Sequence, residues 1–279
     1  MPGRAAPWDA VADEARYERW VISPFAADVE FRLRGAVRRL LAGWRRRGGL
    51  GRRVVLDLGC GRGDGIALVA GRVGFAAGLD FSPRMLDLAE RFLAARGVTP
   101  SRYRGRAGLV RLADELHAVA GGAHRGPTTA LAAADMRNLA WLRGSADLVL
   151  AVNSISPARA AETGRVFGEV ARLLKPGGLL MAVLASLDAF HYLLDLAARR
   201  GVPLGDVGRV DARGMFHEDG ETQKFFTPDE IRALSRANGL HVLALTKVRY
   251  PWTLMRRFGW GYFPGRPRLW DWYLVARPR

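Results

Sequence analysis

The chain has 279 residues, 49% of them hydrophobic and 25% charged, a balance typical of a globular protein with a sizeable core rather than a disordered chain. A single cysteine, Cys60, excludes disulfides within the chain and a cysteine-rich zinc site. No apolar run approaches the ~18 residues of a membrane-spanning helix, and the first residues do not resemble a secretion signal, so we expect a cytoplasmic protein.

The formal net charge is +16, from 43 basic and 27 acidic residues, and most of it lies at the two ends. Residues 1–53 carry +6 and residues 247–279 carry +7. Basic ends suit an anionic partner such as nucleic acid or a membrane surface. A merely solubilising surface is the alternative.

Apolar runs and helix signals alternate through the middle of the chain. The run Val54–Leu58 precedes a glycine cluster and is typical of a buried parallel strand. Ser82-Pro83 and Thr227-Pro228 each place a capping side chain before a proline, which predicts a helix start. Further strands are expected at residues 76–80, 129–134, 147–152, 179–185, 241–248 and 272–276, and a further helix at 158–174, ending at a turn over 175–178. This alternation predicts a mostly parallel sheet with helices on both faces.

Four stretches exceed what such a sheet requires: residues 1–50, 98–127, 187–226 and 249–271. Connections of this length are usually functional or disordered. Residues 121–130 are expected to form a loop.

The most informative segment is a strand that runs into three alternate glycines, Asp57-Leu58-Gly59-Cys60-Gly61-Arg62-Gly63-Asp64. Glycine permits positive φ and a close approach of the backbone to a ligand. The spacing fails the dinucleotide pattern GxGxxG, because the sixth residue is Asp64 counted from Gly59 and Ile66 counted from Gly61. Since an aspartate at the helix start would repel a pyrophosphate, the loop suits a ligand with a cationic sulfonium and amine.

Two further strand ends carry acids. Asp80 ends the second predicted strand, where a carboxylate can accept both hydroxyls of a ribose. Asp135 ends the third, and an aspartate followed by the exposed N–H of Met136 can bind the adenine edge. Ligands of open α/β sheets bind at the carboxyl ends of the strands, so we expect one ligand at these positions. The alternative is that the glycines make a tight turn and the aspartates cap helices.

With these residues in this order, the chain resembles the class I S-adenosylmethionine-dependent methyltransferases. The resemblance covers residues 50–190 closely and 225–279 in outline. It implies a Rossmann-like α/β fold with a seven-stranded, mostly parallel sheet, an antiparallel last strand, helices on both faces, N-terminal cover helices and insertions. The segments that carry it are Asp57 to Gly63, Gly78-Leu79-Asp80-Phe81-Ser82, Ala134-Asp135-Met136, residues 147–154 and Leu173-Leu174-Lys175-Pro176-Gly177-Gly178.

The resemblance also implies one domain over residues 1–279. Cover helices would occupy 1–50, the cofactor-binding core 51–186, a lid or substrate insertion 187–226, and a C-terminal helix with a strand pair 227–279.

S-adenosylmethionine is the cofactor that the resemblance implies. Gly59, Gly61 and Gly63 would line its methionine and ribose portions, Asp57 would hold the loop and the amino-acid end, and Asp80 would take the ribose hydroxyls. The remaining assignments are Phe81 and Met85 beside the adenine, Asp135 and Met136 at its edge, Asn153 at the methionine end and methyl group, and Tyr17, with Trp20, closing over the cofactor. Ordinary helix packing is the alternative for Tyr17 and Trp20.

The segment Asn153-Ser154-Ile155-Ser156 lacks the two prolines and the aromatic residue of family members that methylate base amino groups, which disfavours methylation of base amino groups and a nucleic-acid partner. Cys60 lies inside the glycine loop and cannot serve as the nucleophile of RNA C5 methylation. Asp188 has no convincing set of oxygen ligands around it, so no metal is expected. His217 and His191 are the candidate general bases, with surface or packing roles as their alternatives.

These observations favour a methyltransferase that acts on an O, N or C atom of a small or mid-sized metabolite. The alternatives are a methyltransferase for RNA or protein and a non-catalytic cofactor-binding scaffold. The aromatic and arginine-rich residues 249–273 are expected to form a wall of an apolar acceptor pocket, with Trp260 and Phe263 buried. Base stacking and peripheral membrane contact are the alternatives for this segment. The sequence predicts no oligomeric state.

Overall fold

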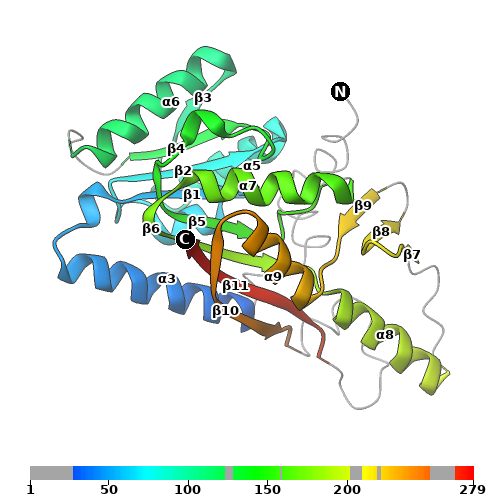
Figure 1. Cartoon of the computed structure of the whole chain (residues 1–279). Coiled ribbons are helices and arrows are strands. Elements are labelled where there is room, and N and C mark those ends of the chain that lie inside the picture. Colours follow the sequence, from blue (N-terminus) through cyan, green and yellow to red (C-terminus); the bar gives the residue numbers. More distant parts are fainter. Residues whose placement is uncertain (1–27, 123–127, 158, 202–208, 219–220, 252–267) are drawn as a thin grey trace.

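The computed structural model describes residues 28–122, 128–157, 159–201, 209–218, 221–251 and 268–279. Its main feature is an eight-stranded sheet in the order β10-β11-β6-β5-β1-β2-β4-β3 (Figure 1). Strand β11 is antiparallel to both β6 and β10, and the other neighbours are parallel. The predicted fold class is therefore confirmed. The strands are β1 Val54–Leu58, β2 Phe75–Asp80, β3 Ser101–Tyr103, β4 Thr128–Ala133, β5 Ala146–Val152, β6 Leu174–Leu184, β10 Leu240–Arg249 and β11 Trp270–Pro278.

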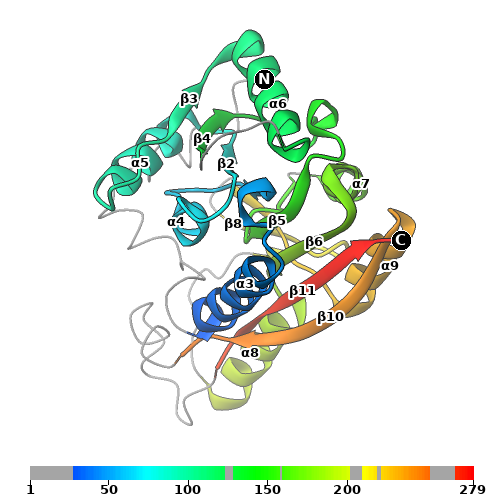
Figure 2. The same cartoon turned by 90° about the vertical axis from the view of Figure 1, so that its left-hand side faces the viewer.

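Helices cover both faces of the sheet, as Figure 2 shows from the side. Helices α6 (Gly105–Ala120), α7 (Thr163–Leu173) and α9 (Pro228–Ala237) contribute to one apolar cluster. Helices α3 (Asp28–Arg46), α4 (Asp64–Val69) and α5 (Pro83–Ala94) contribute to the other. Strand β1 lies between them and is buried throughout, which explains why every residue of the strand except Asp57 is apolar. None of the helices in the described ranges is long and apolar enough to cross a membrane.

Two predicted helix starts are confirmed in detail. Ser82 Oγ accepts a hydrogen bond of 3.1 Å from the N–H of Met85 and begins α5. Thr227 Oγ1 accepts one of 3.2 Å from the N–H of Glu230 and begins α9. Each side chain satisfies an N–H that has no partner inside its helix.

Three local predictions need correction. Residues 98–127 are not only a connection, because they contain β3 and α6, and β3 adds an eighth strand beside β4. The helix expected at 158–174 begins later, as a short 3-10 turn at Ala160–Glu162 followed by α7. The turn at 175–178 lies inside β6 as a bulge, where the register passes from Ala146↔Leu174 to Leu148↔Leu179.

The segment 187–226 forms helix α8 (Leu187–Arg200) and a small sheet of β7 (Arg209–Val210), β8 (Met215–Glu218) and β9 (Glu221–Lys224). We call this segment the insertion. Its two ends meet, since the N–H of Leu187 donates to Phe226 O over 3.0 Å and that of Phe226 to Ala185 O over 2.8 Å. The insertion therefore leaves and rejoins the core at the carboxyl end of β6 (Figure 1).

Candidate active site

The glycine loop between β1 and α4 has the backbone that the sequence predicts. Gly59, Gly61 and Gly63 have φ angles of 63°, 54° and 90°, a region that other residues rarely adopt. The N–H groups of Gly59 and Cys60 both donate to Leu79 O, over 2.7 and 3.1 Å. The loop is thus tied to the carboxyl end of the neighbouring strand β2.

Asp80 ends β2 and holds this loop. Its Oδ2 accepts a hydrogen bond of 3.0 Å from the N–H of Gly61, and its Oδ1 accepts one of 2.9 Å from the N–H of Ser82. The residue is only 6% exposed, so these donors compensate for the burial of its charge. A carboxylate has about four acceptor positions and can serve several donors at once.

Asp57 is buried beneath the same loop, between β1 and α4. A Cβ at Gly65 would lie 2.3 Å from Asp57 Oδ2, so only glycine fits at that position of α4. Burial, together with the nearby charges of Asp64 and Asp80, raises the pKa of Asp57 to about 8, against a hydrogen bond from the Ile66 N–H. A cation bound at the loop would favour the ionised form.

Asn153, directly after β5, connects four parts of the fold. Its Nδ2 donates to Tyr250 Oη over 3.4 Å and to Asp271 Oδ2 over 3.3 Å. Tyr250 Oη in turn donates to Asp271 Oδ2, and Asp271 Oδ1 accepts from the N–H of Ser186 over 3.3 Å. We call Asn153, Tyr250 and Asp271 the amide triad.

The surroundings of the amide triad raise the pKa values of Asp271 and Tyr250. Burial raises the pKa of Asp271 to about 6, although hydrogen bonds from Tyr250, Asn153 and Ser186 oppose this. Burial and the Asp271 charge raise the pKa of Tyr250 well above its usual value. Sequence reasoning missed Tyr250 and Asp271. The available signal was that Asp271 is the lone acid of the basic residues 247–279.

The segment after β5 lies against the glycine loop. A Cβ at Gly59 would lie 2.4 Å from Ser154 Cβ, so only glycine fits there too. Ser154 Oγ and Asn153 Oδ1 are buried and have no hydrogen-bond partner among the described residues. These two neighbouring polar atoms beside the glycine loop are available to a ligand.

The other predicted cofactor residues differ in their surroundings. Met85 is almost fully buried in α5, whereas Phe81 is 39% exposed. Asp135 is exposed and accepts from the N–H and the Nε of Arg137, each over 2.9 Å. Arg137 also pairs with Glu162 at 2.9 Å, and the two acids raise its pKa further above the usual value. Met136 is partly buried against the core.

The two candidate histidines lie in the insertion. His217 on β8 is half exposed, with its Nε2 3.9 Å from Asp211 Oδ2. His191 is exposed on α8, beside the ring of Phe190. Within the described part of the chain, no recorded contact joins either ring to the glycine loop or to Asn153. Tyr17, Trp20, Trp260 and Phe263 lie outside the described residues.

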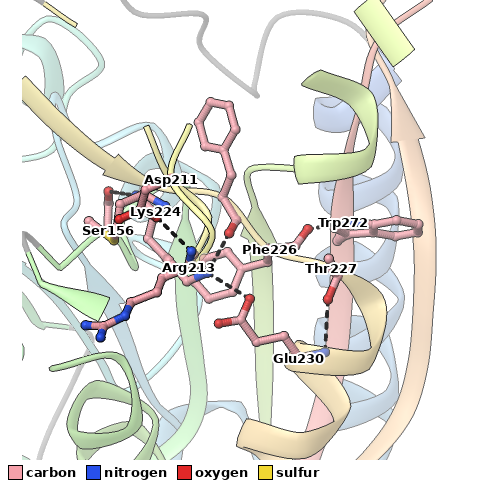
Figure 3. A network of polar contacts seen from close by, with 10 residues as sticks. Ser156, Asp211, Arg213, Lys224, Phe226, Thr227, Glu230 and Trp272 are labelled. Carbon is pink, nitrogen blue, oxygen red and sulfur yellow. Dashed lines mark hydrogen bonds and ion pairs between the residues drawn. The ribbon is translucent and has the colours of Figure 1, made fainter. Parts of the chain in front are cut away.

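A buried lysine fixes the insertion to the core (Figure 3). Lys224 is 1% exposed, and its Nζ donates to Arg213 O, Phe225 O and Glu230 Oε2 over 2.7, 2.7 and 2.8 Å. Its main-chain N–H donates to Ser156 Oγ over 3.0 Å. Lys224 thereby links the insertion to α9 and to the segment that carries Asn153.

Aromatic rings pack where α8 meets the small sheet. Phe216 and Phe225 are stacked at 5.1 Å, and the ring of Phe190 meets each of them edge-on. This contact gives the insertion an apolar centre of its own. In the described ranges, no group of three or more His, Cys, Asp or Glu residues is placed to hold a metal ion.

A family model described as a methyltransferase domain matches residues 56–182, from β1 to β6. This span includes the glycine loop, Asp80, Asp135 and Asn153, the same strand ends that form the site. Residues 56–182 are a methyltransferase domain, and this match together with the fold supports a class I S-adenosylmethionine-dependent methyltransferase. Its cofactor is S-adenosylmethionine, and its methyl acceptor is a small molecule or a macromolecule. The comparison with curated proteins gives no match.

Solved structures agree with the fold of this methyltransferase. A protein from Pyrococcus horikoshii OT3 is 17% identical with a TM-score of 0.57, and the match covers 96% of this chain and 100% of that chain. Magnesium protoporphyrin IX methyltransferase from Synechocystis PCC 6803, solved with bound SAH, is 14% identical with a TM-score of 0.54 and 99% coverage of both chains. A methyltransferase from Methanosarcina mazei is 17% identical with a TM-score of 0.53, covering 81% of this chain and 92% of that chain.

The residues of the site suit this cofactor. The loop has no side chains at its glycines, so a ligand can approach its backbone. Asp80 supplies negative charge for a ligand with a sulfonium and an ammonium group, and such a ligand would favour the ionised form of Asp57 as well. Ser154 Oγ offers a buried polar atom beside the loop.

Proposed function

We propose that this methyltransferase transfers the methyl group to an O, N or C atom of a small or mid-sized metabolite. The observation that carries the proposal is the insertion, which Lys224 ties to the segment after β5 through Ser156. An element held at this position can cover an acceptor next to Asn153. We also propose that residues 1–279 form one domain and that the protein acts in the cytoplasm.

S-adenosylmethionine supplies an electrophilic methyl group on a sulfonium. In our proposal Asp80 accepts hydrogen bonds from the ribose hydroxyls, while its bond to the Gly61 N–H keeps the glycine loop in place. Asp57 adds negative charge once the bound cation favours its ionised form, and Gly59, Gly61 and Gly63 let the backbone approach the methionine portion. Phe81, Met85, Asp135 and Met136 are assigned to the adenine.

Catalysis then rests chiefly on orientation. Methyl transfer needs an in-line approach of the acceptor atom, and holding two reactants in line supplies much of the acceleration in such reactions. The insertion and Asn153 would provide this alignment. His217 and His191 remain candidate bases for an acceptor that must lose a proton.

Exposed arginines favour a second candidate, an RNA or protein acceptor. Arg38, Arg39, Arg45 and Arg46 are exposed on α3 and form a basic surface. Co-purification of nucleic acid, detected as raised absorbance at 260 nm, would support this candidate. Release of S-adenosylhomocysteine with a metabolite acceptor would support the first.

Calorimetric titration with S-adenosylhomocysteine tests the cofactor assignment. Hydrogen bonds to a charged group contribute about 1.5–3 kcal/mol each, and about 1.4 kcal/mol corresponds to a tenfold change in affinity. Asp80→Ala should therefore weaken binding at least about tenfold. Asp87→Ala is the matched control, because Asp87 is a half-exposed residue of α5 paired with Arg102. Equal affinity of Asp80→Ala and the parent would disprove the ribose assignment.

A further inference from the structure

The carboxamide of Asn153 has one orientation that suits its neighbours. Asp271 Oδ2 is an acceptor, and it receives the hydroxyl hydrogen of Tyr250. The oxygen of Tyr250 consequently faces Asn153 with its lone pairs. Both oxygens can only accept a hydrogen bond from Asn153. The NH₂ group of Asn153 therefore points to them, with Nδ2 3.3 Å from Asp271 Oδ2 and 3.4 Å from Tyr250 Oη.

This orientation leaves the other end of the amide without a partner. Asn153 Oδ1 is buried, and nothing in the described residues donates to it. The backbone of Asn153 has a φ of 49°, the sole positive φ at a described residue other than glycine. A left-handed backbone and an orphaned carbonyl both cost free energy, and their coincidence at one residue indicates a functional position.

The location of Asn153 narrows what that function is. The next residue, Ser154, packs against Gly59 of the glycine loop. Two residues further, Ser156 accepts the N–H of Lys224 in the insertion. Asn153 therefore lies at the end of β5, between the loop assigned to the cofactor and the segment assigned to the acceptor.

We propose that Tyr250 and Asp271 are positioning residues that hold Asn153 so that its Oδ1 accepts a hydrogen bond from the methyl acceptor atom. This inference rests on the proposed function, and it restricts the methyl acceptors of the enzyme to a narrower chemical class. The atom that is methylated must then carry a hydrogen, as in an amine or a hydroxyl. Asn153 Oδ1 can only accept hydrogen bonds, so it cannot bind a substrate atom that has no N–H or O–H.

The chemistry of the transfer is consistent with this role. A lone pair of the acceptor nitrogen or oxygen forms the bond to the methyl carbon while the carbon–sulfur bond breaks and its electrons stay on sulfur. The proton of the acceptor becomes more acidic during this step, so its hydrogen bond to Oδ1 strengthens toward the transition state. The proton leaves to solvent after the transfer.

Two cofactor analogues test the proposal without knowledge of the acceptor. Sinefungin carries an amino group near the place of the transferred methyl group. S-adenosylhomocysteine carries neither that amino group nor the methyl group. Titrating both against the full chain isolates the effect of an N–H donor at the transfer position. We expect the parent to bind sinefungin about tenfold more tightly, the value of one hydrogen bond to a charged group.

Three variants complete the test. Asn153→Gly removes the amide and tolerates the positive φ, so it should abolish the preference for sinefungin and keep the affinity for S-adenosylhomocysteine. Tyr250→Phe removes one holder of the amide and should reduce the preference. Tyr273→Phe is the matched control, because Tyr273 is a buried tyrosine of β11 whose hydroxyl has no partner in the described residues, and it should leave the preference unchanged.

The outcomes separate the explanations. If Asn153→Gly weakens both analogues equally, Oδ1 binds the amino-acid end of the cofactor and the proposal is wrong. A preference that survives Tyr250→Phe in full overturns the positioning role. If the parent binds neither analogue, the proposed function itself fails and the inference fails with it.

Discussion

The buried ammonium group of Lys224 holds the insertion against the core, and Lys224→Met tests how much this contact stabilises the protein. Methionine keeps a side chain of similar length but cannot donate a hydrogen bond. The substitution leaves Arg213 O and Phe225 O without this donor, in a place where Lys224 is 1% exposed. Glu230 is 35% exposed and can be hydrated instead, so its loss counts for less.

Two carbonyls that lose the buried ammonium group as their donor, together with a broken ion pair, correspond to about 3–5 kcal/mol. This is a large part of the about 5–15 kcal/mol by which natural proteins are stable. We expect urea unfolding, followed by circular dichroism, to show a lower midpoint for Lys224→Met. We also expect faster proteolysis within the insertion, because the insertion loses its tie to α9.

Arg232→Met is the control for this experiment. Arg232 lies on the same helix α9, but its ion pair with Asp229 is exposed, so the unfolding midpoint should not move. If the free energy of unfolding of Lys224→Met lies within about 1 kcal/mol of that of the parent, the contacts of the ammonium group do not hold the insertion in place.

Two further predictions concern the glycine loop. The pKa of Asp57 is about 8 in the folded protein, above its ordinary value of 3.8, so the stability it contributes is present at low pH and lost as the pH rises toward 8. Asp57→Asn removes this dependence on pH. Between pH 5.5 and 7.5, the unfolding free energy of the variant relative to the parent should increase by up to about 1.4 kcal/mol per pH unit. Parallel pH profiles of the two proteins would contradict the assignment. Gly59→Ala places a Cβ 2.4 Å from Ser154 Cβ and should abolish binding of S-adenosylhomocysteine. Gly177→Ala also has a positive φ, of 78°, but meets nothing within 4 Å, so it should keep the binding, and equal titrations for the two variants would refute the steric argument.

The sequence by itself predicted the elements whose signals are local. The apolar run of β1, the glycines after it and the caps Ser82 and Thr227 act on their own neighbours, so they could be recognised without a fold. Helix α6 was missed because its start has no such signal. Arg104 makes no side-chain cap, and the helix opens with Gly105, whose φ is 64°.

Tertiary structure decided the contacts between distant residues. Asn153 meets Tyr250 and Asp271 across 97 and 118 positions of the chain, and Lys224 reaches Ser156 across 68. In the sequence Lys224 looks like a solvated charge and Asp271 like a polar break between tryptophans. Asp271 becomes a buried partner of Asn153 because β11 inserts antiparallel beside β6, which brings the first residues of β11 to the edge where β5 and β6 end. That order of strands depends on packing over the whole sheet, so no local pattern specifies which strand ends will meet.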